Sequence, residues 1–269
     1  LATGIKIGEV SDSEAIVWTR LTRVPERVGK EGPIPRVFYR NPDTSELEEN
    51  PSGHPDWDVL VQFPNGVTVD GLEGAAPGMA GEARVLYWPE DDPADWKATA
   101  WTAVDPARDY TRQFPLSNLK PGTTYHVKVE TRRADNRALG CATYGKFRTA
   151  PKPDVPSRVL FMVSTGQEYN HLDMTHLGFR IYPAIYAMDP DFFVHTGDIV
   201  YYDHLAKSLA LARWHWWRIY SLPTNREFHR HVASYFIKDD HDTLMNDCYP
   251  GIQTRFMGDF TFEQGLAVF

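Results

Sequence analysis

Two short apolar segments of the chain each end in side chains that can bind a metal ion. In the first, residues 191–203, the apolar run stops at Gly197 and is followed by Asp198 and Tyr201. The second, residues 233–242, ends in the sequence Asp-Asp-His-Asp. Carboxylate and phenol oxygens are hard ligands for metal ions, and the ends of neighbouring parallel strands face one crevice. The sequence therefore predicts one metal site built from both segments.

The first segment supplies the candidate bridging ligand. Asp198 follows Gly197, and a glycine permits the sharp turn and close backbone approach that an ion site requires. We expect Asp198 to bridge two metal ions and Tyr201 to bind one of them as a phenolate, which favours a hard, highly charged ion such as ferric iron. Two other interpretations stay open: Asp198 as the cap of the next helix, and Tyr201 as a core aromatic residue.

The second segment places three carboxylates around one histidine, which is costly unless a cation or water neutralises them. Asp240 is predicted to bind metal, and His241 to hydrogen-bond a phosphoryl oxygen or to protonate the leaving alkoxide. A solvated acidic turn is an equally good interpretation of Asp239 and Asp242. Asn246 is predicted to contact the substrate through its oxygen or its amide donor, with an ordinary turn residue as the alternative.

A third group of polar residues, 164–168, follows an earlier apolar strand. Gly166 would let a phosphate or an ion approach the backbone, and Gln167 is predicted to contact the substrate. Glu168 could point inward or toward solvent. His195 lies inside the apolar run of the first segment, so we expect it in the core or behind the metal ligands rather than among them.

The elements that must position these side chains follow the pattern of an α/β domain. Residues 158–163 are almost continuously apolar, as expected of a parallel strand covered on both faces. Further strands are predicted at 192–194 and 235–237, and helices at 182–188 and near 204–220. This alternation implies right-handed crossovers and a parallel sheet.

The first half of the chain has the pattern of a β-sandwich. Residues 5–10 and 15–20 carry strand-forming residues with a turn between them. In residues 119–131, the sequence Leu-x-Pro-x-Thr-x-Tyr leads into a strand and resembles the tyrosine corner of sandwich domains. We therefore predict a fibronectin type III-like sandwich.

Changes in composition suggest the domain limits. We predict a sandwich domain at 1–150, a linker at 151–157 that three prolines interrupt, and the first part of a catalytic α/β domain at 158–269. Residues 28–110 are too long for an ordinary hairpin connection and are rich in Pro, Gly and acidic residues. They are expected to form an insertion with strands of its own, one of them at 84–88.

Composition excludes several classes of function. The net charge of -8, from 36 acidic and 28 basic residues, argues against a general affinity for nucleic acid or anionic membranes. No apolar run reaches the roughly 18 residues of a membrane span. Cys141 and Cys248 fall in different predicted domains and give no disulfide framework. The chain begins at Leu1 rather than methionine, as a processed secreted protein would and as a trimmed one would.

Together these motifs resemble those of the PhoD-type alkaline phosphatases and phosphodiesterases, a branch of the calcineurin-like metallophosphoesterases. The pattern His-x-Gly-Asp-x-x-Tyr matches residues 195–201, and Asp-Asp-His-Asp followed by Asn-Asp matches 239–242 with 246–247. A sandwich domain before the catalytic domain is also the family arrangement. The resemblance implies hydrolysis of phosphate mono- or diesters by a metal-activated water. It further implies a dinuclear or multinuclear centre of iron and calcium in a secreted or periplasmic enzyme, commonly exported by the twin-arginine route.

Two departures from the family pattern qualify this expectation. The family usually has a cysteine before the glutamine after the first strand, as an iron ligand, whereas this chain has Gly166 and Gln167. The family's catalytic domain also continues beyond the position of Phe269 and contributes further ligands, so a second chain or a further segment is expected to complete it. Two alternatives follow: a hydrolase of sulfate or other oxyanion esters, and a non-catalytic binding module with a vestigial site.

Overall fold

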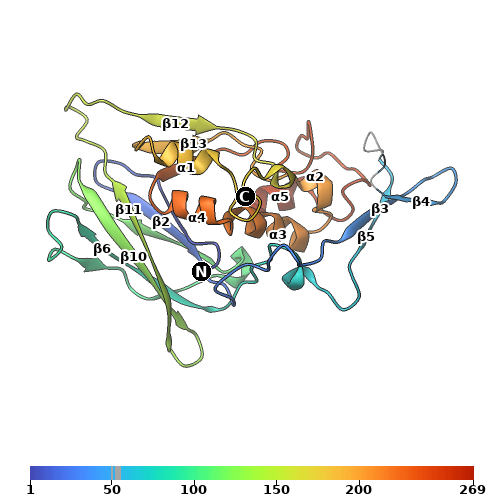
Figure 1. Ribbon diagram of the computed structural model, residues 1–269, viewed down its shortest axis with the longest axis horizontal. Helices are drawn as coiled ribbons and strands as arrows, with labels where there is room; N and C mark the ends of the chain where they lie inside the picture. Colours follow the sequence, from blue (N-terminus) through green and yellow to red (C-terminus); the bar gives the residue numbers. More distant parts are fainter. Residues whose placement is uncertain (50, 52–55) are drawn as a thin grey trace.

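The computed structural model describes residues 1–49, 51 and 56–269, and Figure 1 shows a β-rich half joined to an α/β half. In the β-rich half, one antiparallel sheet has the order β1-β2-β9, with β1 at Ile5–Gly8, β2 at Ala15–Arg20 and β9 at Thr111–Leu116. The second antiparallel sheet has the order β11-β10-β6-β7, and β8 also pairs with β6. Its strands are β6 (Gly81–Pro89), β7 (Lys97–Ala98), β8 (Thr102–Ala103), β10 (Thr124–Arg133) and β11 (Leu139–Arg148). Alternate side chains of both sheets form one buried apolar cluster, as the period of a strand requires.

Tyr125 fixes the turn before β10. Its hydroxyl accepts a hydrogen bond from the backbone N–H of Lys120 at 2.9 Å, and its ring stacks on Phe147 with centroids 5.6 Å apart. Val127 and Val129 point into the same buried cluster. The predicted tyrosine-corner contact is therefore confirmed.

The predicted insertion contains its own small sheet, which extends to the right in Figure 1. Its strands are β3 (Arg36–Arg40), β4 (Leu47–Glu49) and β5 (Asp58–Gln62), in the order β4-β3-β5. Tyr39 stacks on Phe256 with centroids 5.1 Å apart, and Val37 and Leu72 belong to the buried cluster of the α/β half. The first 150 residues thus contribute to two cores, and the limits 1–150, 151–157 and 158–269 stay a prediction.

The α/β half is built on a parallel sheet, as predicted. Its strands are β12 (Phe161–Ser164), β13 (Phe192–His195) and β14 (Ala233–Phe236), in the order β12-β13-β14. Its helices are α1 (Ile181–Tyr186), α2 (Tyr202–Leu205), α3 (Leu209–Tyr220), α4 (Pro223–His229) and α5 (Phe262–Val268). Single turns of 3₁₀ helix occur at Val69–Gly71, Pro106–Arg108 and Tyr169–His171. Among the helices of the described part, none has the length and apolar character needed to cross a membrane.

Local sequence explains where element predictions were wrong. The single helix predicted near 204–220 is two helices, because Ser208 is extended at φ -159° and ψ 160° and its hydroxyl accepts the N–H of Leu211 to cap α3. Helix α4 was not predicted; Pro223 occupies its first turn, where a missing N–H costs little. The first strand of the sheet begins at Phe161 rather than at residue 158.

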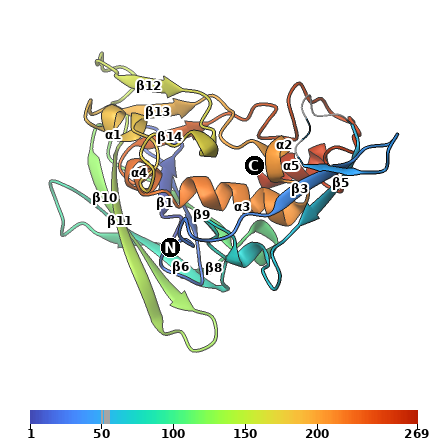
Figure 2. The same ribbon diagram turned by 45° about the vertical axis from the view of Figure 1, so that its right-hand side comes forward.

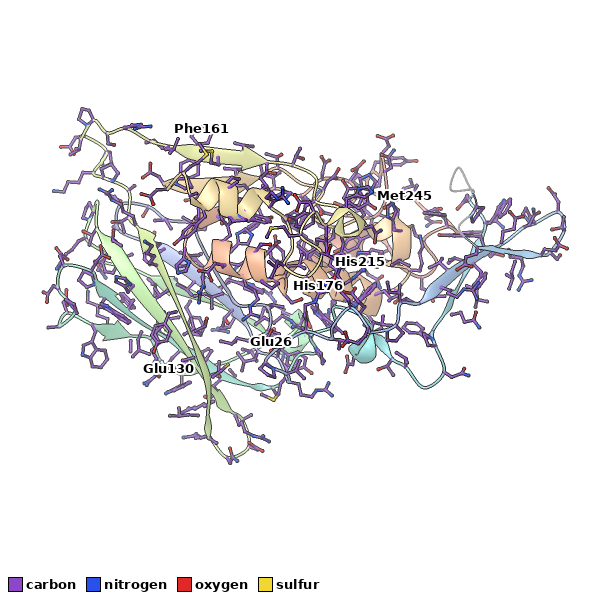
Figure 3. All side chains as sticks on the ribbon, viewed as in Figure 1. Glu26, Glu130, Phe161, His176, His215 and Met245 are labelled. Carbon is purple, nitrogen blue, oxygen red and sulfur yellow. The ribbon has the colours of Figure 1, made fainter. Side chains whose placement is uncertain are left out.

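One face of the parallel sheet is left open. Figures 1 and 2 show β12 as its outer strand, and Figure 3 labels Phe161 on it. Phe161 and Val163 are 53% and 54% exposed, and the Phe161 ring stacks on Phe192 of β13 with centroids 5.2 Å apart. Since parallel sheets are usually covered on both faces, an apolar face this exposed is unusual.

The β-rich half meets the α/β half through Lys6. Its buried amine lies 3.9 Å from the ring centroids of both Trp18 and Tyr220, and it has no hydrogen-bond partner in the described part of the chain. Contact with aromatic ring faces stabilises a buried cation by about 2 kcal/mol. This is less than the several kcal/mol of free energy that its dehydration costs. Burial, followed by the charge of Arg20, therefore lowers the pKa of Lys6 well below its ordinary value.

Lys6 should make stability depend on pH. Between its lowered native pKa and its unfolded pKa of about 10.4, the unfolded chain binds a proton that the native chain does not, so stability rises with pH by up to about 1.4 kcal/mol per unit. Urea unfolding at several pH values should show this rise in the natural protein and a smaller one in Lys6→Met. The exposed Lys30→Met protein is the control, and equal slopes for all three proteins would contradict the assignment.

Asp242 joins the loops that follow β13 and β14. One of its oxygens accepts the backbone N–H groups of Ile199 and Val200, both at 2.7 Å, and the other accepts the N–H of Asp239 at 3.1 Å. Asp242 is fully buried, and burial raises its pKa to about 6. The interpretation of Asp242 as part of a solvated turn is therefore wrong, because its buried oxygens accept hydrogen bonds from three backbone amides.

Replacing Asp242 by alanine should destabilise the protein by about 3 kcal/mol, since each buried N–H left without a partner costs roughly 1–3 kcal/mol. Asp242→Asn should recover part of this loss, because its amide retains one acceptor oxygen. Urea unfolding measures both, with the exposed Asp259→Ala protein as the matched control. A loss no larger than that of the control would show that these hydrogen bonds do not hold the loops.

Candidate metal centre

The structure brings together three of the predicted site residues. Asp198, Asp240 and His241 each offer one donor atom, and these atoms all lie within 4.8 Å of one another. Asp198 comes from the loop after β13, and the other two come from the loop after β14. The two strand ends therefore share one site, which has the mixed oxygen and nitrogen donors of a metal centre.

Backbone conformation turns Asp198 into this site. Gly197 has a φ of +112° and Asp198 a φ of +55°. A Cβ on Gly197 would lie only 2.5 Å from the Cβ of Asp239, so the two loops touch at a position where only glycine fits. Residues with side chains rarely adopt positive φ, and such strain is concentrated at functional sites.

One oxygen of the Asp198 carboxylate makes no hydrogen bond within the described residues. Its Oδ1 atom is buried with no hydrogen-bond partner in the described part of the chain, and its Oδ2 accepts the Tyr201 hydroxyl at 3.3 Å. Burial, together with the charges of Asp240 and Asp239, raises the pKa of Asp198 despite the opposing charge of His241. A buried, partnerless carboxylate oxygen is costly, and a bound cation would offset that cost.

Tyr201 borders the same site. Its ring centroid lies 4.5 Å from the ring centroid of His241 and 5.7 Å from that of His204. Burial, followed by the charge of Asp198, raises the pKa of the Tyr201 phenol. The side chain is half-buried beside Asp198, so its phenolate would need a metal ion to form near neutral pH.

Asp240 is held by the backbone of its own loop. Its Oδ1 accepts the N–H of His241 at 2.8 Å, and its Oδ2 accepts the N–H of Asp247 at 2.5 Å. Each carboxylate oxygen has a second lone pair, so both remain able to bind an ion. Asn246 is exposed and donates to the carboxylate of Asp247 at 2.8 Å, which keeps it close to Asp240; its substrate contact stays a prediction.

The Gln167 side chain lies in the interior. Its Oε1 accepts the Tyr182 hydroxyl at 2.6 Å and the Asn225 amide at 3.5 Å. Its backbone N–H donates to the carbonyl of Asp198 at 2.9 Å. Gln167 thus touches the site through its backbone, and a substrate contact by its amide stays a prediction.

Gly166 and His195 lie beside Tyr201 and Gly197, respectively. Gly166 has a φ of +60°, and a Cβ added there would lie 3.6 Å from the Tyr201 hydroxyl oxygen. His195 is 1% exposed and accepts the N–H of Gly197 at 3.3 Å through Nδ1. Burial lowers the pKa of His195 to about 4. This interior position is the one predicted for His195.

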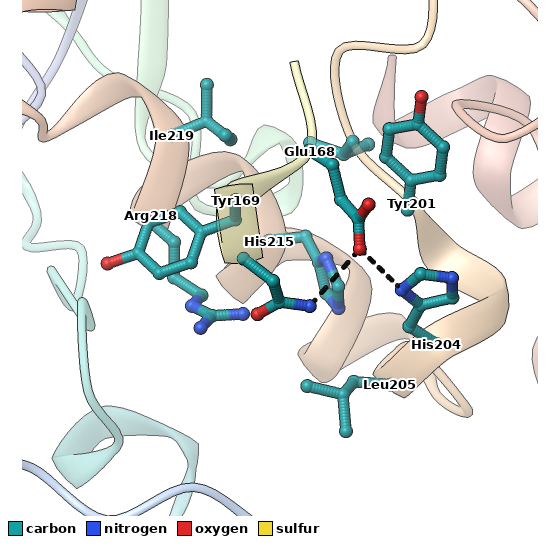
Figure 4. A pocket seen from close by; sticks show the side chains of 10 residues that line it. Glu168, Tyr169, Tyr201, His204, Leu205, His215, Arg218 and Ile219 are labelled. Carbon is teal, nitrogen blue, oxygen red and sulfur yellow. Dashed lines mark hydrogen bonds and ion pairs between the residues drawn. The ribbon is translucent and has the colours of Figure 1, made fainter. Parts of the chain in front are cut away.

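A small cavity lies beside Tyr201, and Figure 4 shows Glu168 and His204 facing each other in it. The Glu168 carboxylate lies 3.3 Å from Nδ1 of His204 and 3.1 Å from Nδ1 of His171. Glu168 therefore engages neighbouring side chains, where the sequence left both orientations open.

Sequence reasoning missed one acidic residue of the site. Asp203 lies in the first turn of α2, and its Oδ2 is 3.0 Å from Nδ1 of His241. Burial works against the imidazolium, but this contact and the charges of Asp198 and Asp240 raise the pKa of His241 to about 9. The available signal was an acidic residue one position after the Tyr201-Tyr202 pair.

Comparisons with known proteins agree with this fold. No family model matches the chain, and neither does any curated protein. The solved structure of PhoD superposes with a TM-score of 0.62 at 14% identity, covering 98% of this chain and 42% of the PhoD chain. A purple acid phosphatase, PPD1 from yellow lupin (Lupinus luteus) seeds, superposes with a lower TM-score of 0.48 at 14% identity, covering 98% of this chain and 40% of its own. At such identity the likeness to PhoD shows the fold alone: this chain has a PhoD-like fold and spans less than half the length of PhoD.

Proposed function

We propose that this chain carries part of the active site of a metal-dependent phosphoester hydrolase. The observation that carries the proposal is the buried, partnerless Oδ1 of Asp198 within 4.8 Å of donors from Asp240 and His241. Asp198, Tyr201 and Asp240 are the residues that would hold the ions. When bound, the metal ions supply an activated water and neutralise charge on the phosphoryl oxygens.

The residues of the chain would then position the ester. His241 would donate a hydrogen bond to the phosphoryl group or a proton to the leaving oxygen. Asn246 and Gln167 are proposed to contact the substrate from the loops beside it. The predominance of oxygen donors supports hard ions such as iron and calcium. Because Gly166 has no side chain that could bind metal, these oxygen donors alone would select between the two ions. A secreted or periplasmic location is part of the same proposal and rests on the motif resemblance.

The open face of the parallel sheet supports a further part of the proposal. Phe161 and Val163 expose apolar surface on β12, whereas a two-sided parallel sheet would bury it. The matched region is 42% of the PhoD chain. We therefore propose that further polypeptide, joined to this chain or separate from it, covers the outer face of β12 and completes the catalytic domain.

Asp198→Asn should abolish metal binding while leaving the fold intact, because asparagine tolerates the positive φ at this position. We expect stoichiometric metal in the natural protein by elemental analysis, and at least about a 100-fold loss of metal affinity in the variant, since even residues behind a ligand alter affinity 10–100-fold. Hydrolysis of 4-nitrophenyl phosphate and bis(4-nitrophenyl) phosphate should fall in parallel.

The exposed Asp259→Asn protein is the control for this experiment. Retention of both metal and activity by Asp198→Asn would refute the proposed site. Absence of metal from the natural protein would support a vestigial site instead. A faster rate on 4-nitrophenyl sulfate than on the phosphate would show that the ester is a sulfate.

Gly166→Cys should add a thiolate ligand to the centre, because the new Cβ would lie 3.6 Å from the Tyr201 oxygen. Positive φ will cost roughly 1–2 kcal/mol of stability. Titration with Co²⁺ should then produce thiolate-to-cobalt absorption in Gly166→Cys. Gly122→Cys is the matched control, since Gly122 also has positive φ, at +62°, but nothing lies within 4 Å of its added Cβ. Equal spectra for the two variants would place position 166 outside the centre.

A further inference from the structure

The second antiparallel sheet of the β-rich half has one face toward the sandwich core and one face toward solvent. Val85 and Val127 point into the core, and the residues that alternate with them lie on the other face, because successive side chains of a strand point to opposite sides. Figures 1 and 2 show β6, β10 and β11 on the side of the molecule away from α2. This solvent-facing surface therefore lies apart from the candidate metal centre.

Aromatic side chains gather on this surface. Trp88 of β6 and Tyr144 of β11 occupy it by strand alternation. The register in which β7 pairs with β6 sets Trp96, the residue before β7, opposite Trp88. Trp96 and Tyr144 are 61% and 54% exposed, and Trp101 lies against Arg84 of the same surface. We call Trp88, Trp96, Trp101 and Tyr144 the aromatic face.

Two rings of the aromatic face are held in place by their neighbours. The guanidinium carbons of Arg84 and Arg132 lie 4.6 Å and 4.5 Å from the ring centroid of Trp101. The Trp88 ring stacks on the His126 ring with centroids 5.9 Å apart and an angle of 18° between the planes. Side chains that are already fixed lose little conformational entropy when a ligand binds. The surface is therefore partly preorganised for binding.

The charged side chains among these rings are paired with one another. Arg84 donates to Glu130 at 2.7 Å, and the amine of Lys128 lies 2.6 Å from the same carboxylate. Arg132 donates to Glu82 at 2.6 Å. Each of these three cations thus faces a carboxylate on the same surface. Since nucleic acids and anionic membranes are bound through cations that are free to meet phosphates, these pairs favour an uncharged ligand.

A neutral polysaccharide has the complementary chemistry. The C–H groups of a sugar ring carry a slight positive charge and stack on aromatic rings, whose faces are negative. The sugar hydroxyls can hydrogen-bond the paired carboxylates and guanidiniums, which keep unused acceptors and donors. A protein partner would remove these ion pairs from water at a cost in free energy, whereas sugar hydroxyls replace the water that the pairs lose.

We propose that the aromatic face binds an extended, neutral β-1,4-linked polysaccharide of the cellulose or chitin type. Rings spread across several strands of one sheet suit a polymer whose sugar rings form a flat ribbon rather than a helix. Bound in this way, the chain would hold its candidate metal centre at a polysaccharide surface. Binding requires neither metal ions nor hydrolysis and is therefore independent of the proposed function.

Sedimentation of the whole chain with microcrystalline cellulose and with chitin tests this surface, with insoluble starch as the helical polymer for comparison. The natural protein should sediment with cellulose or chitin, and the polymer that captures it identifies the sugar. Trp96→Ala and Tyr144→Ala should each bind about 10-fold more weakly, the loss expected for one aromatic contact. Tyr249→Ala is the matched control, because Tyr249 is also 61% exposed but lies between β14 and α5.

Salt distinguishes stacking from ionic adsorption. Affinity should stay the same between about 0.1 M and about 1 M NaCl, since screening weakens only interactions between charges. Binding to neither cellulose nor chitin would overturn the proposal. So would equal binding to starch, a loss of binding at high salt, or equal weakening by Tyr249→Ala.

Oxidation by N-bromosuccinimide gives a second measurement that needs no variant. The reagent modifies exposed indole rings, and mass spectrometry of peptides locates the modified residue. A soluble oligosaccharide of the captured polymer should protect Trp96 from oxidation, whereas a malto-oligosaccharide should not. Oxidation of Trp96 at the same rate with and without the first oligosaccharide would contradict the proposal. If the natural protein hydrolyses no phosphoester, the proposed function fails, and the binding and protection results still decide the role of the aromatic face.

Discussion

The candidate site depends on the three hydrogen bonds that Asp242 accepts from two different loops. The amides of Ile199 and Val200 follow Asp198 directly, and the amide of Asp239 precedes Asp240. One fully buried carboxylate therefore sets the separation between the two acidic side chains of the candidate site. Hydrogen bonds to a charged acceptor are among the strongest that proteins make, so this contact can hold together loops that carry like charges.

The like charges around Asp198 favour the binding of a cation. Asp198, Asp239 and Asp240 lie close enough to raise the pKa of Asp198, and burial adds to the cost of ionising it. His241 brings one positive charge to the group, and Asp203 in turn faces His241. This arrangement leaves negative charge in excess around the partnerless oxygen of Asp198, which is the physical basis of the proposed metal centre.

The wider fold holds the helix behind the site through a second buried group of charges. Glu73, from the insertion, accepts hydrogen bonds from Arg27 at 2.6 Å and from Arg218 of α3 at 3.1 Å. Its backbone carbonyl accepts the indole N–H of Trp214 at 2.8 Å. The first half of the chain therefore supplies the carboxylate that neutralises the buried Arg218 of α3. Lys6 also lies against the rings of Trp18 and Tyr220 where the halves meet.

The sequence by itself determined the parallel sheet, the tyrosine corner and the meeting of Asp198 with Asp240 and His241. Those features follow from short-range periodicity, turn chemistry and the rule that parallel strands end at one edge. Only the tertiary structure decided the surroundings of Asp242, Gln167 and Asp203. Whether a carboxylate meets backbone amides, solvent or an imidazole depends on segments distant in sequence, such as residues 199–200 for Asp242 and α1 and α4 for Gln167. The local sequence pattern does not predict those neighbours, because burial and hydrogen-bond partners are set only when the chain packs.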